Sequence, residues 1–160
     1  MTPAIAQLKK TRTPHTLHHY HHTPGEHAYG REAVDKLGVD ENRVFKTLVA
    51  RLDQGDLVVA VMPVATMLSM KQLAKTAGAR RAAMADPAEV MKATGYVLGG
   101  VSPLGQKKNL PTWIDSSAQA FSTILVSAGR RGLQVELNPA DLARLTRASF
   151  ALLQSTASLT

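Results

Sequence analysis

The amino-acid sequence predicts a single domain of the α+β class, in which a mixed β-sheet carries peripheral helices. Its 160 residues match the commonest domain size, and 44% of them are apolar, which is enough to build one sizeable core. The expected strands outnumber well-spaced strand–helix–strand units, and several follow one another directly along the chain. Neither a repeat nor a low-complexity linker interrupts the sequence. We therefore expect residues 1–160 to form one domain with a mixed or antiparallel sheet.

Capping residues define the elements expected in the first forty residues. A helix is expected over 2–10, because Thr2 is a good N-cap and a proline follows it. A short strand is expected over 16–22. The next helix, over 26–37, ends at Gly38, since glycine adopts the left-handed C-cap conformation without steric cost.

The clearest pair of elements is a β-hairpin. The runs 44–52 and 57–62 are rich in β-branched residues, and the Asp-Gln-Gly-Asp segment between them is a strong turn signal. Further capping and turn residues predict helices over 69–75 and 86–95, and strands over 96–101, 112–115, 123–127 and 132–137. A C-terminal helix is expected to start at Asn138 and to turn Leu142, Leu145 and Phe150 inward.

Composition excludes several classes of site. The sequence has no cysteine, so it offers no disulfide, thiolate nucleophile or cysteine-based zinc site. Its 19 Lys and Arg residues against 12 Asp and Glu residues give a formal charge of +7, which favours a polyanionic partner such as nucleic acid or a phosphorylated ligand. The N-terminus has no apolar run of signal-peptide length, and no stretch approaches the roughly 18 apolar residues of a membrane span. We expect a soluble cytoplasmic protein without membrane contact.

The segment 95–108 holds four of the eleven glycines, which is more than a turn needs. Adjacent glycines at Gly99-Gly100 allow backbone N–H groups to approach a ligand and converge on a developing oxyanion, although a strand bulge followed by a surface loop accounts equally well for them. Two better-known motifs fail here. Lys107 stands one residue too late for a phosphate-binding P-loop, and Leu104 replaces the final glycine of a nucleophile elbow around Ser102. The sequence supports neither ATP hydrolysis nor serine-hydrolase chemistry.

Lys46 lies inside an apolar strand, where alternation places it on the same face as Val44 and Leu48. A lysine on an apolar face needs an anionic partner or a route to water. Two interpretations stay open. Lys46 either extends to solvent at a sheet edge or is a fixed cation at the floor of a cavity, suited to a phosphate, a carboxylate or a developing negative charge.

The histidine-rich run 18–22 invites a metal hypothesis, which strand geometry weakens. Alternation lets at most two of these histidines converge, and a structural metal needs about four ligands. We expect no metal and no cofactor, and a strand that turns Tyr20 toward a pocket. The basic pairs Lys107-Lys108 and Arg130-Arg131 are either ordinary solvated turns or contacts to tRNA phosphates.

Four segments in order along the chain resemble the YbaK/EbsC family of aminoacyl-tRNA deacylases. They are Tyr20 with His22, 44–48, 94–105 and 126–133. The resemblance covers nearly the whole chain. Because this family is related to the editing domain inserted in many bacterial prolyl-tRNA synthetases, it implies a compact domain around a mixed, barrel-like sheet.

The resemblance also implies roles for individual residues. Lys46 would bind near the 3′-terminal adenosine or the ester that it carries, and the backbone of Gly99 and Gly100 would cradle the aminoacyl carbonyl. The pocket would be lined by Tyr20, Tyr29, Thr47, Ser102, Pro103 and Ser127. The sequence departs from the family pattern in two places. Gln134 stands where relatives often have aspartate, so that carboxylate is absent or replaced by Glu136, and Tyr29 replaces a frequent phenylalanine.

The activity implied by the resemblance is removal of cysteine from mischarged tRNA(Pro), and also from Cys-tRNA(Cys), by a hydrolase- or lyase-type reaction. In cysteine-specific members the substrate's thiol attacks its own ester and releases a thiolactone, so the enzyme needs only to position the thiol and stabilise the oxyanion. Two alternatives stay open: removal of another amino acid such as alanine by an activated water, and a non-catalytic module that binds tRNA or a synthetase. Prolyl-tRNA synthetase is the expected partner.

Overall fold

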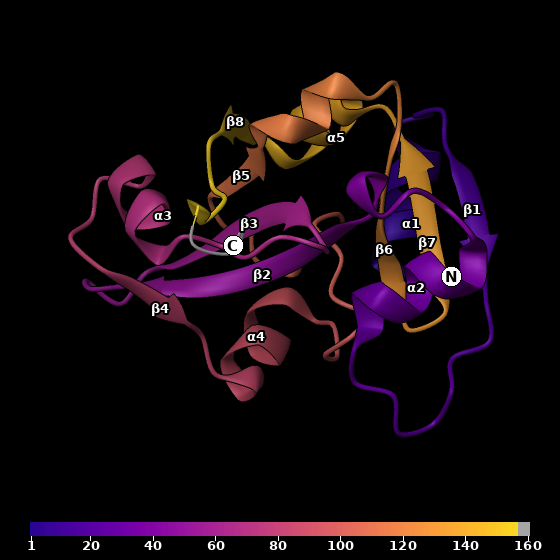
Figure 1. Ribbon diagram of the computed structural model, residues 1–160, viewed down its shortest axis with the longest axis horizontal. Helices are drawn as coiled ribbons and strands as arrows, with labels where there is room; N and C mark the ends of the chain where they lie inside the picture. Colours follow the sequence, from indigo (N-terminus) through magenta and orange to yellow (C-terminus); the bar gives the residue numbers. More distant parts are fainter. Residues whose placement is uncertain (157–160) are drawn as a thin grey trace.

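The computed structural model describes residues 1–156, which form two β-sheets surrounded by helices (Figure 1). The strands are β1 (Thr16–His19), β2 (Phe45–Leu52), β3 (Leu57–Pro63), β4 (Ala82–Met84), β5 (Thr112–Asp115), β6 (Ile124–Arg130), β7 (Leu133–Leu137) and β8 (Ser149–Ala151). The α-helices are α1 (Pro3–Lys10), α2 (Tyr29–Leu37), α3 (Met70–Thr76), α4 (Pro87–Thr94) and α5 (Pro139–Thr146), and two short 3₁₀ helices cover Glu41–Arg43 and Ser116–Ala120. The predicted mixture of helices and strands is confirmed.

A parallel bridge connects the two sheets. The small sheet has the order β1-β7-β6 and is antiparallel throughout, whereas the large sheet, β4-β2-β3-β5-β8, combines antiparallel pairs with the parallel pairs β3–β5 and β5–β8. A parallel bridge between Val44 and Leu125 joins the start of β2 to β6. The large sheet is therefore mixed, as predicted, and the bridge connects it to the antiparallel sheet in the other half of the domain.

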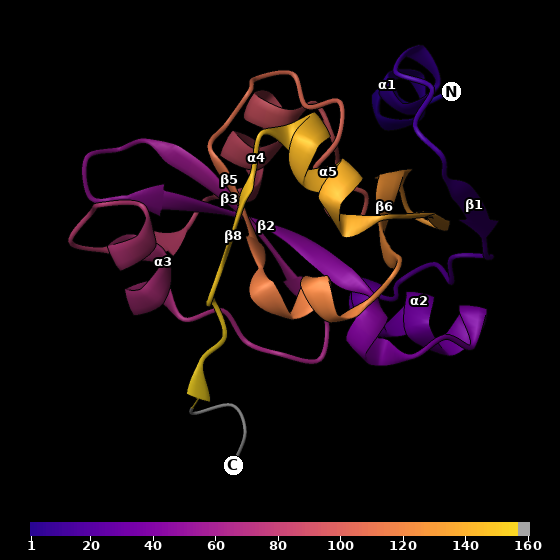
Figure 2. The same ribbon diagram turned by 90° about the horizontal axis from the view of Figure 1, so that it is seen from above.

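Helices α1 and α2 cover opposite faces of the small sheet, as the view from above shows (Figure 2). On α1, Ile5 and Leu8 pack into the main core with apolar residues of β6 and β7 such as Val126. On α2, Val34 packs with Leu125, the neighbour of Val126 that faces the other way. The alternation of β6 thus separates the main core from the α2 side of the sheet.

Most caps and turns lie where the sequence places them. The hydroxyl of Thr2 accepts a hydrogen bond from the N–H of Ile5, at 3.2 Å, and opens α1. Gly38 and Gly95 close α2 and α4 in the left-handed conformation, and the β2–β3 hairpin pairs as expected. Local chemistry therefore determines these boundaries.

Four expectations were wrong. No strand forms over 96–101, because Gly99 has a φ of +82° and Gly100 donates to the carbonyl of Val97 in a turn. The first strand ends at His19, and α2 begins only at Tyr29.

Phe150 belongs to a strand and not to the C-terminal helix, since Arg147 ends α5 in the left-handed conformation at a φ of +56°. The three-residue edge strands β4 and β8 were not predicted, because only their neighbours in the sheet define them. Within residues 1–156 no helix is both long and apolar enough to span a membrane.

Candidate active site

A cavity of about 270 Å³ lies where the two sheets meet, between the start of α2, strand β2, the loop after α4 and the β6–β7 pair. Its lining residues are Tyr29, Gly30, Val44, Phe45, Lys46, Thr47, Leu48, Val64, Leu98, Gly99, Val101, Ser127 and Gln134. Most of these side chains are apolar, and the few polar ones are gathered on the strands. A concave, largely apolar cavity with a few convergent polar groups is the usual form of a small-molecule site.

Three polar side chains stand in a row across neighbouring strands at the floor of the cavity. The bridge between Val44 and Leu125 brings β2 and β6 side by side, so that Lys46 and Ser127 lie two residues further along the same faces. On the next strand, Ser127 is directly opposite Gln134. The row exists because Val44, the residue before β2, bridges to Leu125 of β6, although the two segments are far apart in the sequence.

Lys46 is the cation of this site. Its ammonium donates a hydrogen bond to the carbonyl of Thr66 at 2.6 Å, and burial lowers its pKa. Across the lining residues of the cavity no carboxylate faces it, and none of the ion pairs within residues 1–156 includes it. A partly buried positive charge without an anionic partner favours an anion or a developing negative charge in the cavity.

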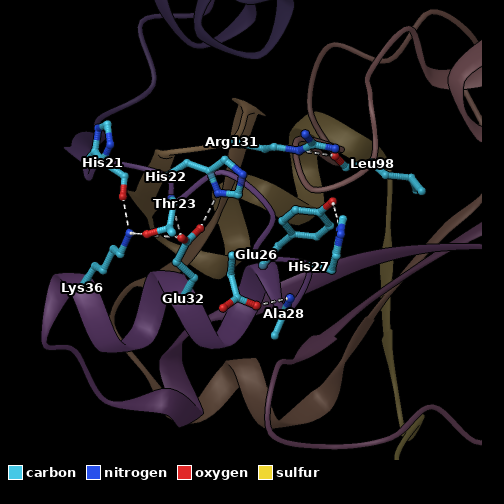
Figure 3. Close-up of polar contacts among 11 residues, drawn as sticks. His21, His22, Thr23, Glu26, His27, Ala28, Glu32, Lys36, Leu98 and Arg131 are labelled. Atoms are coloured by element: carbon cyan, nitrogen blue, oxygen red, sulfur yellow. Dashed lines mark hydrogen bonds and ion pairs between the residues drawn. The ribbon is translucent and has the colours of Figure 1, made fainter.

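Tyr29 and Gly99 form one wall by direct contact. A Cβ atom added to Gly99 would lie 2.6 Å from Cδ1 of Tyr29, so only glycine allows the loop to approach this ring. The guanidinium of Arg131 lies 4.9 Å from the centre of the Tyr29 ring, and its Nε donates to the carbonyl of Leu98 at 2.8 Å (Figure 3). Arg131 therefore ties the loop to the aromatic wall.

A buried carboxylate supports this wall from behind. Glu32 on α2 is only 6% exposed, and it binds Nδ1 of His22 at 2.6 Å, the N–H of Thr23 at 2.9 Å and the ammonium of Lys36 at 3.1 Å (Figure 3). The His22 ring in turn lies 5.9 Å from the Tyr29 ring, centre to centre. Burial alone would raise the pKa of Glu32, but these three donors outweigh it and lower the pKa to about 2.

This network makes a testable contribution to stability. A carboxyl group whose pKa is lower in the folded protein than in the unfolded chain stabilises the fold above the unfolded value and loses that effect as the pH falls through the folded one. We expect Glu32→Gln to lower the free energy of unfolding by about 2 kcal/mol at pH 7, and this difference to shrink between pH 4.5 and pH 2. Urea unfolding over this pH range measures it. If the difference in unfolding free energy between Glu32→Gln and the wild type did not change with pH, Glu32 would not be the ionised carboxylate that stabilises the fold.

Two backbone donors at the cavity are unoccupied. Gly99 and Val101 line it, and their N–H groups have no hydrogen-bond partner in the part of the chain that the structure describes. The N–H of Gly100, by contrast, donates to the carbonyl of Val97 at 2.9 Å. The backbone N–H groups without a partner thus belong to the residues on either side of Gly100.

The structure brings together many of the predicted site residues, but not all of them. The cavity lining includes Lys46, Gly99, Tyr29, Thr47 and Ser127. Four predicted residues are not part of this lining: Gly100, Tyr20, Ser102 and Pro103. Tyr20 packs against the core beneath α2, and Pro103 lines a separate cleft. Ser102 is fully buried, and its hydroxyl accepts a hydrogen bond from the N–H of Leu104.

Gln134 is the lining residue whose role the sequence interpretation missed. It is 7% exposed, and its Oε1 has no hydrogen-bond partner. The sequence pattern of β7, Leu-Gln-Val-Glu-Leu, could have indicated this position. Alternation along the strand turns Gln134 away from the main core. Glu136, two residues later, does not take its place. That carboxylate binds Arg43 at 2.8 Å and His18 at 2.8 Å, outside the cavity lining.

The four basic residues predicted to contact tRNA phosphates are divided between two places. Arg131 lies against Tyr29, and Arg130 is exposed at the end of β6, whereas Lys107 lines a second cleft beside α1 and α5. Lys108 is exposed in the same loop as Lys107. Within residues 1–156, no group of three potential ligands could hold a metal ion.

Comparison with known proteins identifies the family. Residues 23–145 match the model of the aminoacyl-tRNA editing domain. The chain is 36% identical over 150 residues to EbsC of Enterococcus faecalis, which is provisionally named a Cys-tRNA(Pro)/Cys-tRNA(Cys) deacylase; the match covers 94% of this chain and 91% of EbsC. It is 31% identical over 131 residues to the Escherichia coli multifunctional Ser/Thr-tRNA deacylase ProXp-y, covering 79% of this chain and 78% of that protein.

A solved structure provisionally described as a trans-editing enzyme for prolyl-tRNA synthetase superposes with a TM-score of 0.81 at 22% identity, covering 97% of this chain and 99% of that one. At this identity the superposition shows the fold. The resemblance inferred from the sequence motifs is confirmed, and the chain belongs to the family of aminoacyl-tRNA editing domains.

Proposed function

We propose that this protein is a trans-editing deacylase that releases cysteine from mischarged tRNA(Pro). Aminoacyl-tRNA editing is the activity of its family. The observation that carries the proposal is Lys46, which lines a small cavity and has no ion-pair partner within residues 1–156, in a sequence with no cysteine and no elbow serine. Such a site is built to bind an ester and stabilise its oxyanion, and the attacking group comes from the substrate.

The reaction balances without a protein nucleophile. The cysteine sulfur of the substrate attacks the ester carbonyl carbon, the C–S bond forms, and the carbonyl oxygen becomes an oxyanion. Lys46 and the N–H groups of Gly99 and Val101, which belong to residues that line the cavity, would stabilise that charge. The intermediate then breaks the C–O bond to the ribose, the thiol proton passes to the ribose oxygen, and a thiolactone and free tRNA leave.

Positioning can supply much of the rate. One preorganised oxyanion donor contributes about 3 to 4 kcal/mol, and correct orientation of reacting groups contributes roughly 7 to 11 kcal/mol. Ser127 and Thr47 line the cavity and would orient the aminoacyl group, while Tyr29 closes one wall. Gly100, Tyr20, Ser102 and Pro103 would act by supporting the walls.

Single-turnover deacylation tests the function and the choice of amino acid together. Proline tRNA carrying cysteine, serine or alanine is mixed with excess protein, and the remaining ester is followed in time. We expect cysteine to be released fastest, and S-methylcysteine, which has no thiol proton, to persist. Rapid loss of alanine would instead indicate an activated water, and no loss from any substrate with retained tRNA binding would indicate a binding module.

The partners follow from the same proposal. Aminoacyl-tRNA is the substrate, and prolyl-tRNA synthetase, or its tRNA, would supply the selectivity that a small cavity lacks. Arg130, Arg131, Lys107 and Lys108 would contact tRNA phosphates, so binding should weaken with salt. A cytoplasmic location and the absence of a cofactor belong to the same proposal.

A further inference from the structure

Two polar residues of the cavity lining have a buried side-chain oxygen atom that lacks a hydrogen bond. Within residues 1–156, Oγ1 of Thr47 and Oε1 of Gln134 are the buried side-chain oxygen or nitrogen atoms without a partner, and both residues line the cavity. Buried polar atoms in native proteins are almost always hydrogen-bonded, and the exceptions gather at functional sites. The Gln134 side chain also hydrogen-bonds Tyr20, so its unpartnered Oε1 and the Thr47 hydroxyl are the groups left to interact with a ligand.

The position of Gln134 indicates where the donor of such a ligand lies. Gln134 is opposite Ser127 in the β6–β7 pair, at the floor of the cavity in the row that ends with Lys46. The amide is neutral, and its oxygen can accept a hydrogen bond from a hydroxyl, a thiol or an amine.

Charge separates the two donors that an aminoacyl ester carries. Its α-ammonium group would enter a cavity whose lining holds the Lys46 ammonium and no carboxylate, so the two positive charges would repel each other. A neutral side-chain hydroxyl or thiol meets no such repulsion. The α-ammonium group is thus better placed toward the solvent, with the side chain directed at the floor.

The remaining walls do not distinguish a hydroxyl from a methyl group. Leu48, Val64 and Val101 are apolar and contribute contacts of similar strength to any small side chain. A hydrophobic wall discriminates only weakly between substrates that differ by one small group. Discrimination is much stronger when the wrong substrate leaves a buried polar group of the protein without its hydrogen bond.

We propose that Gln134, assisted by Thr47, selects aminoacyl groups that carry a hydroxyl or thiol on Cβ and rejects alanine. This inference rests on the deacylase function proposed above and adds the substrate class and the residues that choose it. The hydroxyl of serine or the thiol of cysteine donates its one proton to Oε1 of Gln134 and accepts from the Thr47 hydroxyl, whereas alanine leaves both groups without a partner.

The test compares substrate ratios and not rates alone. Single-turnover rates on proline tRNA carrying serine, cysteine or alanine are measured for the wild type, Gln134→Met and Thr47→Val, which keep the side-chain volume but lose the oxygen. We expect Gln134→Met to lower the serine and cysteine rates roughly 10- to 100-fold and to leave the alanine rate within about twofold. Thr47→Val should change the ratio in the same direction by a smaller factor.

Gln119→Met, at an exposed position, is the matched control and should leave all three rates unchanged. Thermal unfolding and circular dichroism confirm that the variants fold. An equal loss for all three substrates would overturn the proposal, because Gln134 would then serve the α-amino group or the fold. A wild type that cleaves none of the substrates would overturn the deacylase function itself, and an unchanged ratio in an active protein would overturn only the selection by Gln134.

Discussion

Replacing Lys46 with alanine is expected to lower the single-turnover rate of cysteine release by about 10²- to 10³-fold, the range observed when one oxyanion donor is lost. Lys46 lines the cavity, its ammonium donates to the carbonyl of Thr66, and the lining holds no carboxylate that would neutralise it. Because its charge acts on the developing oxyanion, the loss should appear in the rate of the chemical step and only weakly in tRNA binding. Rapid-quench assays at saturating protein measure the step directly.

Although removing the Lys46 charge should slow the reaction, it should leave the stability of the fold unchanged or increase it. Burial lowers the pKa of Lys46, which means that the folded protein disfavours its charged form. Lys46→Met, which keeps the volume and removes the charge, should therefore unfold at the same temperature as the wild type or higher while remaining inactive. A folded Lys46→Met protein with normal turnover would remove Lys46 from the mechanism, and Lys92→Met, at an exposed position of α4, serves as the control.

Replacing Gly100 with alanine is expected to reduce the rate by at least tenfold and to cost about 1 to 3 kcal/mol of stability. Gly100 is buried, and an added Cβ would lie 2.7 Å from the Cα of Arg130 and 3.1 Å from its carbonyl carbon. Backbone atoms of a paired strand cannot move aside as a flexible side chain can. The loop would therefore shift away from β6 and carry the donors of Gly99 and Val101 with it.

The structure offers a contrasting glycine for this experiment. Gly25 lies in a loop where an added Cβ meets nothing within 4 Å, and its φ of +88° makes alanine costly only through backbone strain. Gly25→Ala should thus lower stability slightly and leave single-turnover kinetics normal. Normal kinetics in Gly100→Ala as well would show that the close contact with β6 does not position the cavity.

Sequence reasoning located the elements that local chemistry controls. Thr2 caps α1, Asp86 caps α4, and Gly38 and Gly95 end their helices, because capping and left-handed φ angles depend on neighbouring residues only. The β2–β3 hairpin was also predicted correctly, because its turn residues lie next to one another in the sequence. Its prediction also placed Lys46 inside a strand, where an unpaired charge calls for a functional explanation.

The sequence by itself determined the mixed α/β class, the family and the segments that carry Lys46 and Gly99. Only the tertiary structure showed that one bridge, Val44 to Leu125, sets Lys46 beside Ser127, with Gln134 on the next strand, and that the expected strand 96–101 is a loop. The physical reason is the range of the interactions. Caps and turns are decided within a few residues, whereas a bridge between residues 44 and 125 and the unpartnered oxygens of cavity-lining residues depend on how the whole chain packs.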